Sequence, residues 1–408
     1  MSSWIRENQK YLQWAMYITA AVLLFAWLQP LVAERSAVTV IERTIRGLQL
    51  GGIYTIIALG IVVINKSSGV FNFAHGGMMM ISSYLFFAFF SAQNISLVLA
   101  IILASVTVLM TVTTASWEML KQPQVLGGSV ATIAVLSFLM SFQPEGSITL
   151  LGVVEIQSFG WINALTGAIT GTILMGLLIE RFTIRPLIGQ PIFAAVMVTL
   201  ALAEILSGVT TLIWGPNPKP LTIFGEQSPF LPGTYTRIRN PIEIDTSAWL
   251  GEAIQIDQPR LYAFFIALIA FAAFFLLFRF TNIGLAMRAT SENQSLAESV
   301  GLRVRVILAV TWGVAALLAG VAGIMHVGAS DTNSLSTDLQ FIALRAFPAV
   351  LLGGLESITG ALVGGLILGL TEEWAKMLFG GEIAIELAPY VVLMVVLVLR
   401  PEGLFGEK

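Results

Sequence analysis

The stretch Gly47–Tyr84 reads GLQLGGIYTIIALGIVVINKSSGVFNFAHGGMMMISSY and decides the fold class of this chain. It belongs to two apolar runs, 44–64 and 70–91, each long enough to cross about 30 Å of hydrocarbon as an α-helix. Their apolarity is continuous rather than alternating, which favours helices over the strands of a membrane barrel. The polar residues 65–69 between the runs indicate a turn at one membrane surface. The stretch therefore predicts a helical membrane protein.

The composition of the whole chain agrees with this class. Of the 408 residues, 56% are hydrophobic and 11% are charged, whereas a soluble domain carries about 25% charged residues. The chain cannot cover itself with a solvated surface, so we expect the lipid bilayer around it. Cysteine is absent, which excludes disulfides and thiolate metal sites. The net charge of -3 argues against nucleic acid as a partner.

Apolar runs recur along the chain and predict an all-α, polytopic membrane protein of about 12 transmembrane helices. The first run is longer than a signal-peptide core and lacks a small-x-small cleavage site, so we expect a retained span. Twelve crossings place both termini on one side. That side would hold 12 of the 21 Lys and Arg residues, which favours cytoplasmic termini. The expected spans are 11–33, 44–64, 70–91, 95–116, 125–142, 161–180, 191–214, 260–279, 306–327, 341–354, 358–376 and 386–400.

Two segments are too polar to span. Segment 214–260 contains seven of the 15 prolines and predicts a β-rich outer loop, either passive or a docking surface. Segment 280–306 has a helical pattern, with Asn282 as a candidate N-cap and Gly301 after the last turn. Its apolar stripe can lie in the lipid interface or insert into a groove of a cytoplasmic protein. The stripe consists of Leu285, Ala289, Leu296 and Val300.

Polar residues inside the expected spans are candidates for function. Asn72 and His75 either complete a hydrogen-bonded turn or face a pathway through the membrane or hold its gate. Glu204 lies mid-span and implies a partner on another helix or a water-filled cavity. Glu372 and Glu373 lie near an outer helix end, where we expect them to be solvated. Arg345 is expected to extend its guanidinium to the outer surface.

Glycines at four-residue spacing in the run GALVGGLILG predict a small face that allows close helix approach. Packing within the bundle or against a second membrane subunit would account for this face. The glycines are Gly360, Gly364, Gly365 and Gly369.

Several motifs resemble permease subunits of bacterial ABC importers of the branched-chain amino-acid type. The resemblance covers about 44–91, 161–214 and 260–408 and rests on the order and spacing of all motifs together. The extra first span within residues 1–43 and an inserted helix pair with a loop at about 95–160 depart from the family pattern. The matching motifs are the opening stretch with NFAHG, IERFTIRPL, AMRATSENQSLAESVGLRV, ALRAFPAVLLGGLESITGALVGGLILGLTE and LVLRPEGLFG.

The resemblance implies a permease domain over 44–408, with a periplasmic loop at 215–259 and a cytoplasmic coupling segment at 281–305. ABC permeases carry a loop of Glu-Ala-Ala, three residues and Gly. The matching Ala297 and Gly301 are present here, whereas the leading glutamate is not. The resemblance assigns ATPase coupling to this segment, with Arg288, Glu292, Ala297 and Gly301 as the candidates.

The family pattern also implies the partners. They are a second permease subunit, two cytoplasmic ATPase subunits and a periplasmic substrate-binding protein, in a bacterial inner membrane. The chain contains no Gly-Lys pair and therefore no phosphate-binding P-loop. We thus expect no cofactor and no enzyme activity in this chain, and ATP and Mg in the partner ATPase.

The resemblance suggests a branched-chain amino acid as the solute, followed by urea, a short amide or an aromatic carboxylate. The alternative function is a self-contained secondary transporter or channel. Such a protein would place carboxylates or histidines at the midplane on broken helices. Only Glu204 and His75 approach that pattern.

Overall fold

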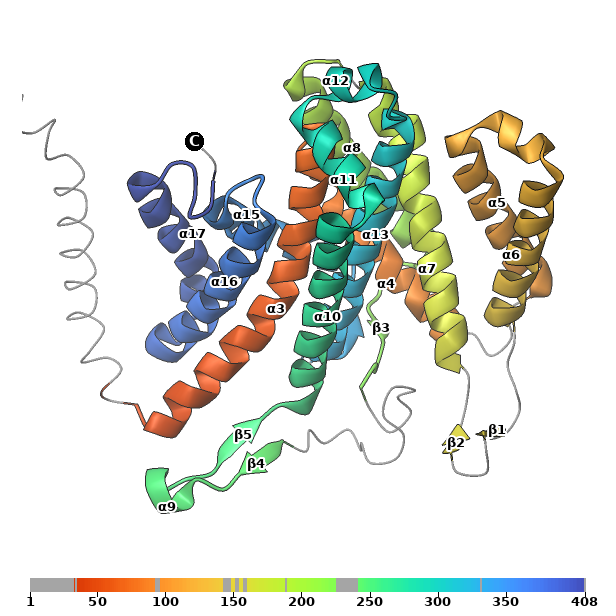
Figure 1. Cartoon of the computed structure of the whole chain (residues 1–408). Helices are drawn as coiled ribbons and strands as arrows, with labels where there is room; N and C mark the ends of the chain where they lie inside the picture. Colours follow the sequence, from red (N-terminus) through yellow and green to blue (C-terminus); the bar gives the residue numbers. More distant parts are fainter. Residues whose placement is uncertain are drawn as a thin grey trace, which may run out of the picture.

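The computed structural model describes residue 33 and residues 35–406 except 92–95, 142–147, 151–153, 157–159, 188, 225–240 and 331. Within this part the chain is a helical bundle, with short strands confined to its loops (Figure 1). Among the described residues, seven helices are long and apolar enough to cross a membrane. The fold is therefore a polytopic all-α membrane protein. The expected first span, 11–33, lies outside the described residues, and the total of 12 crossings stays a prediction.

One helix, α3 (Ala37–Ser68), runs through the centre of the bundle. Ser36 begins it by accepting a hydrogen bond from the Thr39 amide, and Gly69 ends it with φ 65° in the left-handed region. Residues 51–64 are buried on every side of the helix. A helix that is apolar all round and fully covered is typical of a bundle core.

The helices around α3 fall where the apolar runs predict them. Up to residue 329, successive long helices run in opposite directions, so each loop joins neighbouring helix ends (Figure 1). The bounds are α4 (His75–Ser91), α5 (Leu97–Ala115), α6 (Pro123–Ser141), α7 (Gly160–Leu178), α8 (Ile192–Trp214), α10 (Gln258–Phe280), α13 (Val304–Ala329), α16 (Ile358–Phe379) and α17 (Glu382–Leu399).

The run expected as a single helix over 341–354 is two short helices, α14 (Leu339–Arg345) and α15 (Phe347–Gly353). Pro348 lies at the start of α15, where its missing N–H costs nothing. The residue before proline, Phe347, is restricted as well, which disfavours a continuous helix here.

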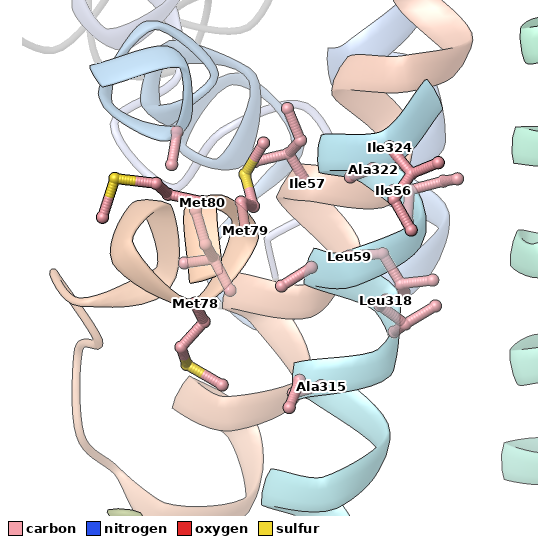
Figure 2. Close-up of a cluster of buried hydrophobic side chains, with 14 of the residues drawn as sticks. Ile56, Ile57, Leu59, Met78, Met79, Met80, Ala315, Leu318, Ala322 and Ile324 are labelled. Atoms are coloured by element: carbon pink, nitrogen blue, oxygen red, sulfur yellow. The ribbon is translucent and has the colours of Figure 1, made fainter. Parts of the chain in front are cut away.

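The α3, α4 and α13 helices meet in the hydrophobic core (Figure 2). Large side chains of α3 and α4, such as Ile57 and Met79, meet small residues of α13, including Ala315 and Ala322. Lipid tails are as apolar as these side chains, so the bundle gains from close van der Waals packing rather than from removal of apolar surface from water.

The two ends of the bundle carry different structures (Figure 1). One end, here called the hairpin end, carries the antiparallel pair β4 (Ile242–Ile244) and β5 (Ile254–Ile256) with α9 (Ser247–Leu250) between them. The other, here called the α11 end, carries α11 (Asn282–Glu292) and α12 (Gln294–Ser299). The two polar segments thus lie at opposite ends, and which end faces the cytoplasm stays a prediction.

Further short strands occur in the loops. Near the hairpin end, β3 (Lys219–Pro220) pairs with β6 (Ser334–Leu335), and β1 (Ile148–Leu150) pairs with β2 (Val154–Ile156). The predicted β-structure of the 214–260 loop is therefore present in its described part. Helices α5 and α6 pack on each other and on α7 and stay largely uncovered.

The backbones of α3 and α16 are in close contact, where Gly47 and Gly51 face Gly365 and Gly369. A methyl group added at Gly51 would lie 2.7 Å from the Leu366 Cα. One added at Gly369 would clash with the Gly51 backbone. The glycines therefore set the distance between these helices.

We predict that Gly369→Ala destabilises the purified chain by about 1–3 kcal/mol, because backbone atoms cannot yield to the new methyl group. Gly313→Ala is the matched control, since Gly313 is also helical and buried but nothing lies within 4 Å of the position that its methyl group would take. Thermal unfolding in detergent measures both. Equal melting temperatures for the two variants would contradict the close contact.

Candidate functional site

The connection between α3 and α4 turns back into the bundle. Gly69 N–H donates to the Asn65 carbonyl at 2.8 Å, which closes α3. Asn72 Oδ1 then accepts from the Ala74 amide at 3.0 Å, an Asx turn that opens α4. The Asn72 side chain is buried, and its amide nitrogen lies 3.3 Å from Met78 Sδ. Its contacts are those of a turn residue.

His75 lies deeper than the ends of the apolar runs indicate. A Cβ at Gly60 would be 2.8 Å from His75 Nε2. Gly60 precedes the end of α3 by eight residues, or about 12 Å of helix. Neither ring nitrogen of His75 has a hydrogen-bond partner among the described residues, although the side chain is only 1% exposed. An unpaired buried imidazole costs free energy, which the turn alone does not explain.

Glu204 projects from α8 on a face that the described bundle leaves exposed. It makes no hydrogen bond or ion pair with any residue in the described ranges. On the same helix Ile205 is 59% exposed. A carboxylate at this depth is unfavourable against lipid. The face therefore suits a partner subunit or a hydrated pathway better than hydrocarbon.

The helical pattern expected in segment 280–306 is divided between two helices, α11 and α12. Asn293 causes the break, because its extended backbone ends α11 and its side chain accepts from the Leu296 amide at 2.9 Å to begin α12. Thr281, rather than Asn282, caps α11 by accepting from the Gly284 amide at 3.0 Å. Both corrections reflect side chains that compete with the helix for backbone groups.

The four candidate coupling residues occupy different environments. Arg288 turns back to α10, where it donates to the Phe278 carbonyl and lies 5.4 Å from the Phe278 ring centroid. Glu292 is exposed. Ala297 is buried in a small cluster at the start of α13. Gly301 follows α12 with φ 89°, which favours glycine.

The α11–α12 segment also presents apolar side chains outward. Leu296 is 62% exposed and Val300 is 71% exposed. At the same time Gln294 Nε2 donates to the Ser67 carbonyl at 3.2 Å, which ties α12 to the end of α3. The segment is thus attached to the bundle on one side and has an uncovered apolar surface on the other.

The four-residue glycine pattern of α16 serves two neighbours. Gly365 and Gly369 face α3, whereas Gly360 and Gly364 face the α15 backbone at Gly353 and Ala349. Both contacts lie within this chain.

The expectation that Glu372 and Glu373 are solvated is wrong. Tyr54 Oη donates to both carboxylate oxygens of Glu372, at 2.9 and 3.0 Å. Arg43 pairs with Glu373 at 2.9 Å, and both carboxylates are buried. The partners are more than 300 residues away in sequence, so no local pattern indicates them.

Two more ion pairs escape sequence reasoning. Arg345 pairs with Glu386 of α17 at 2.8 Å, and the extension of its guanidinium to the outer surface stays a prediction. Arg185 makes two bonds, of 2.8 and 3.0 Å, to the fully buried Glu180, across a π-helical turn at Ile179–Ile184. No group of three or more His, Cys, Asp or Glu that could hold a metal occurs among the described residues.

A protein-family model matches most of this helical chain. The family described as "Branched-chain amino acid transport system / permease component" matches residues 43–117 and 120–399. The match includes the α3–α4 turn, α8, the α11–α12 segment and the glycine-rich α16. It also extends over α5 and α6, the helices that the sequence motifs leave outside the resemblance.

Curated relatives agree over most of the chain. The permease protein BraD of the high-affinity branched-chain amino acid transport system of Pseudomonas aeruginosa is 24% identical over 370 residues, 90% of this chain and 96% of the relative. The LivH permeases of Salmonella typhimurium and Escherichia coli are 23% and 24% identical, with the same coverage of each chain. No solved structure matches this chain.

We predict that Tyr54→Phe destabilises the chain by about 1–3 kcal/mol, because it leaves the buried Glu372 without its donor. The double variant Tyr54→Phe with Glu372→Leu should lose less than the two single variants together, since it removes both partners. Thermal unfolding of the four proteins measures the cycle. Additive losses would show that the two side chains do not interact.

Proposed function

The chain belongs to the family of permease components of branched-chain amino acid transport systems, and we propose from this premise that ATP hydrolysis in partner subunits drives it to import a small amphipathic solute. As an ABC importer permease it provides the membrane passage. The proposed solute is a branched-chain amino acid, by analogy with the transport systems to which BraD and LivH belong. The proposed assembly has two permeases, two ATPases that bind ATP and Mg, and a periplasmic substrate-binding protein.

The observation that carries the proposal is the α11–α12 segment. It combines an exposed apolar surface at Leu296 and Val300 with attachments to α3, α10 and α13. A partner that covers this surface and moves would pull on three helices at once. This is how an external ATPase could reorient the bundle, with the α11 end in the cytoplasm.

Reconstitution in liposomes tests the proposal. The chain, its ATPases and its binding protein together should accumulate L-leucine only when ATP is supplied. The chain alone should not accumulate L-leucine from a proton or sodium gradient. Gradient-driven accumulation by the chain alone would instead establish the alternative, a secondary transporter.

We predict that Glu292→Lys lowers ATP-driven uptake at least about tenfold, the effect of losing one charged contact with a partner. The folded chain should keep its melting temperature, because Glu292 is exposed and has no partner among the described residues. Glu402→Lys is the control, since it reverses an exposed charge at the same end of the bundle. Normal uptake by the Glu292→Lys variant would show that Glu292 does not contact the ATPase.

Gly301 tests the same surface through backbone conformation. We expect Gly301→Val to reduce uptake and raise uncoupled ATP hydrolysis, because a β-branched residue at φ 89° costs about 1–3 kcal/mol and would displace α12 from α13. Nothing lies within 4 Å of the position that a Cβ would take there, so a steric clash is not the cause. Unchanged coupling would show that the turn does not set the position of α12.

Glu204 tests the pathway. If it lines a hydrated route, Glu204→Leu should reduce the uptake rate while the chain becomes no less stable, because removal of an exposed intramembrane charge relieves its desolvation cost. Ile205→Leu changes the neighbouring exposed position and serves as the control. If the uptake rate is unchanged in both variants, Glu204 does not line the route and contacts lipid or a neighbouring subunit instead.

A further inference from the structure

A pocket of about 520 Å³ lies at the α11 end, between α3, α10, α11 and α16. Lys66 lines it from the end of α3, and Phe278 and Arg279 line it from the last turns of α10. Arg288 of α11 and Phe405 of the C-terminal turn complete the walls. These elements come together at the α11 end of the bundle (Figure 1).

Cations outnumber carboxylates in this pocket. Lys66, Arg279 and Arg288 line it against Glu356 alone, which leaves an excess of two positive charges. Lys66 Nζ donates to the Glu356 backbone carbonyl at 3.2 Å, and Arg288 donates to that of Phe278. Bonds to neutral carbonyls orient these two cations without neutralising them.

Arg279 is the least satisfied of the three. Its guanidinium lies 5.8 Å from the ring centroids of Phe275 and Phe280. It makes no hydrogen bond or ion pair with another described residue. Since a guanidinium has five N–H donors, the ring contacts leave all of them available to an anion.

The start of α16 adds to the positive field. Ile358 and Thr359, in the first turn of this 22-residue helix, line the pocket. Amides in the first turn of a helix have no intrahelical acceptors and carry the positive end of the helix dipole. Ser357 Oγ accepts from the Gly360 amide at 3.0 Å and shares a hydrogen bond with Thr359 Oγ1 at 3.2 Å.

The remaining lining is apolar and continues onto the outside of α10. Phe278 and Phe405 line the pocket, and on the outer surface of α10 Phe280 is 71% exposed and Leu276 is 54% exposed. A soluble anion gains nothing from contact with such a surface. A molecule that carries both a phosphate and acyl chains matches both parts of it.

We propose that this pocket binds the phosphate headgroup of an anionic phospholipid, whose acyl chains lie along the exposed face of α10. The phosphate accepts hydrogen bonds from Arg279, Arg288 and Lys66. Because these residues belong to α10, α11 and α3, the lipid fastens the start of the α11–α12 segment to the bundle. The inference does not depend on which solute is carried or on ATP.

The test is lipid retention by the purified full chain, measured by native mass spectrometry with phosphatidylglycerol or phosphatidylcholine. We expect the wild type to retain phosphatidylglycerol at least about tenfold more strongly, and Arg279→Gln to lose that preference. Arg279→Lys should keep most of it, which separates loss of charge from misfolding. Arg305→Gln, an exposed cation at the same end outside the pocket, should behave as wild type.

Two results would overturn the proposal. One is equal retention of the two lipids, or an equal loss in the Arg279→Gln and Arg305→Gln variants. The other concerns the chain purified with phosphatidylcholine: inorganic phosphate would stabilise it as much as phosphatidylglycerol does. That result would assign the pocket to a soluble phosphate.

Discussion

The contact between the backbones of α3 and α16 is the constraint on which the rest of the bundle depends. Gly47 and Gly51 on one helix meet Gly365 and Gly369 on the other, and even a methyl group does not fit. In a bilayer no difference in apolarity drives helices together, so such close contact supplies much of the association. It also brings Tyr54 to Glu372 and Arg43 to Glu373, which allows two carboxylates to remain in the membrane region.

The sequence predicts well those features that depend on local composition. Continuous apolar runs locate the long helices, and a proline-rich stretch locates the short strands of the loop, because both signals come from neighbouring residues. Pairings across the bundle leave no such signal. Glu372 and Glu373 look like a solvated helix end until Tyr54 and Arg43 are placed beside them, and the apolar run gives no indication of how deep His75 lies.

The α11–α12 segment shows a different limit. A helical stripe over 284–301 is present, but Asn293 offers its side chain to the Leu296 amide and divides the helix. The spacing of apolar residues shows which side of a helix is apolar. It does not show the break at Asn293, because the break depends on one side-chain hydrogen bond that competes with the helix. The sequence therefore identifies the candidate residues but not the surroundings of their side chains. In the structure Ala297 is buried, Glu292 is exposed, and Arg288 points back to α10.

The packing also limits how the bundle can move. The backbones of α3 and α16 touch at Gly47, Gly51 and Gly369, so a slide of one helix along the other would press backbone atoms and larger side chains together. These two helices therefore move together, and α13 and α4 follow because their side chains interlock with α3. By contrast, α5 and α6 are mostly uncovered and α8 presents a broad exposed face. Any force applied through α12 to Ser67 at the end of α3 must then turn this central group as one body, and the compliance lies at its edges, where Glu204 is found.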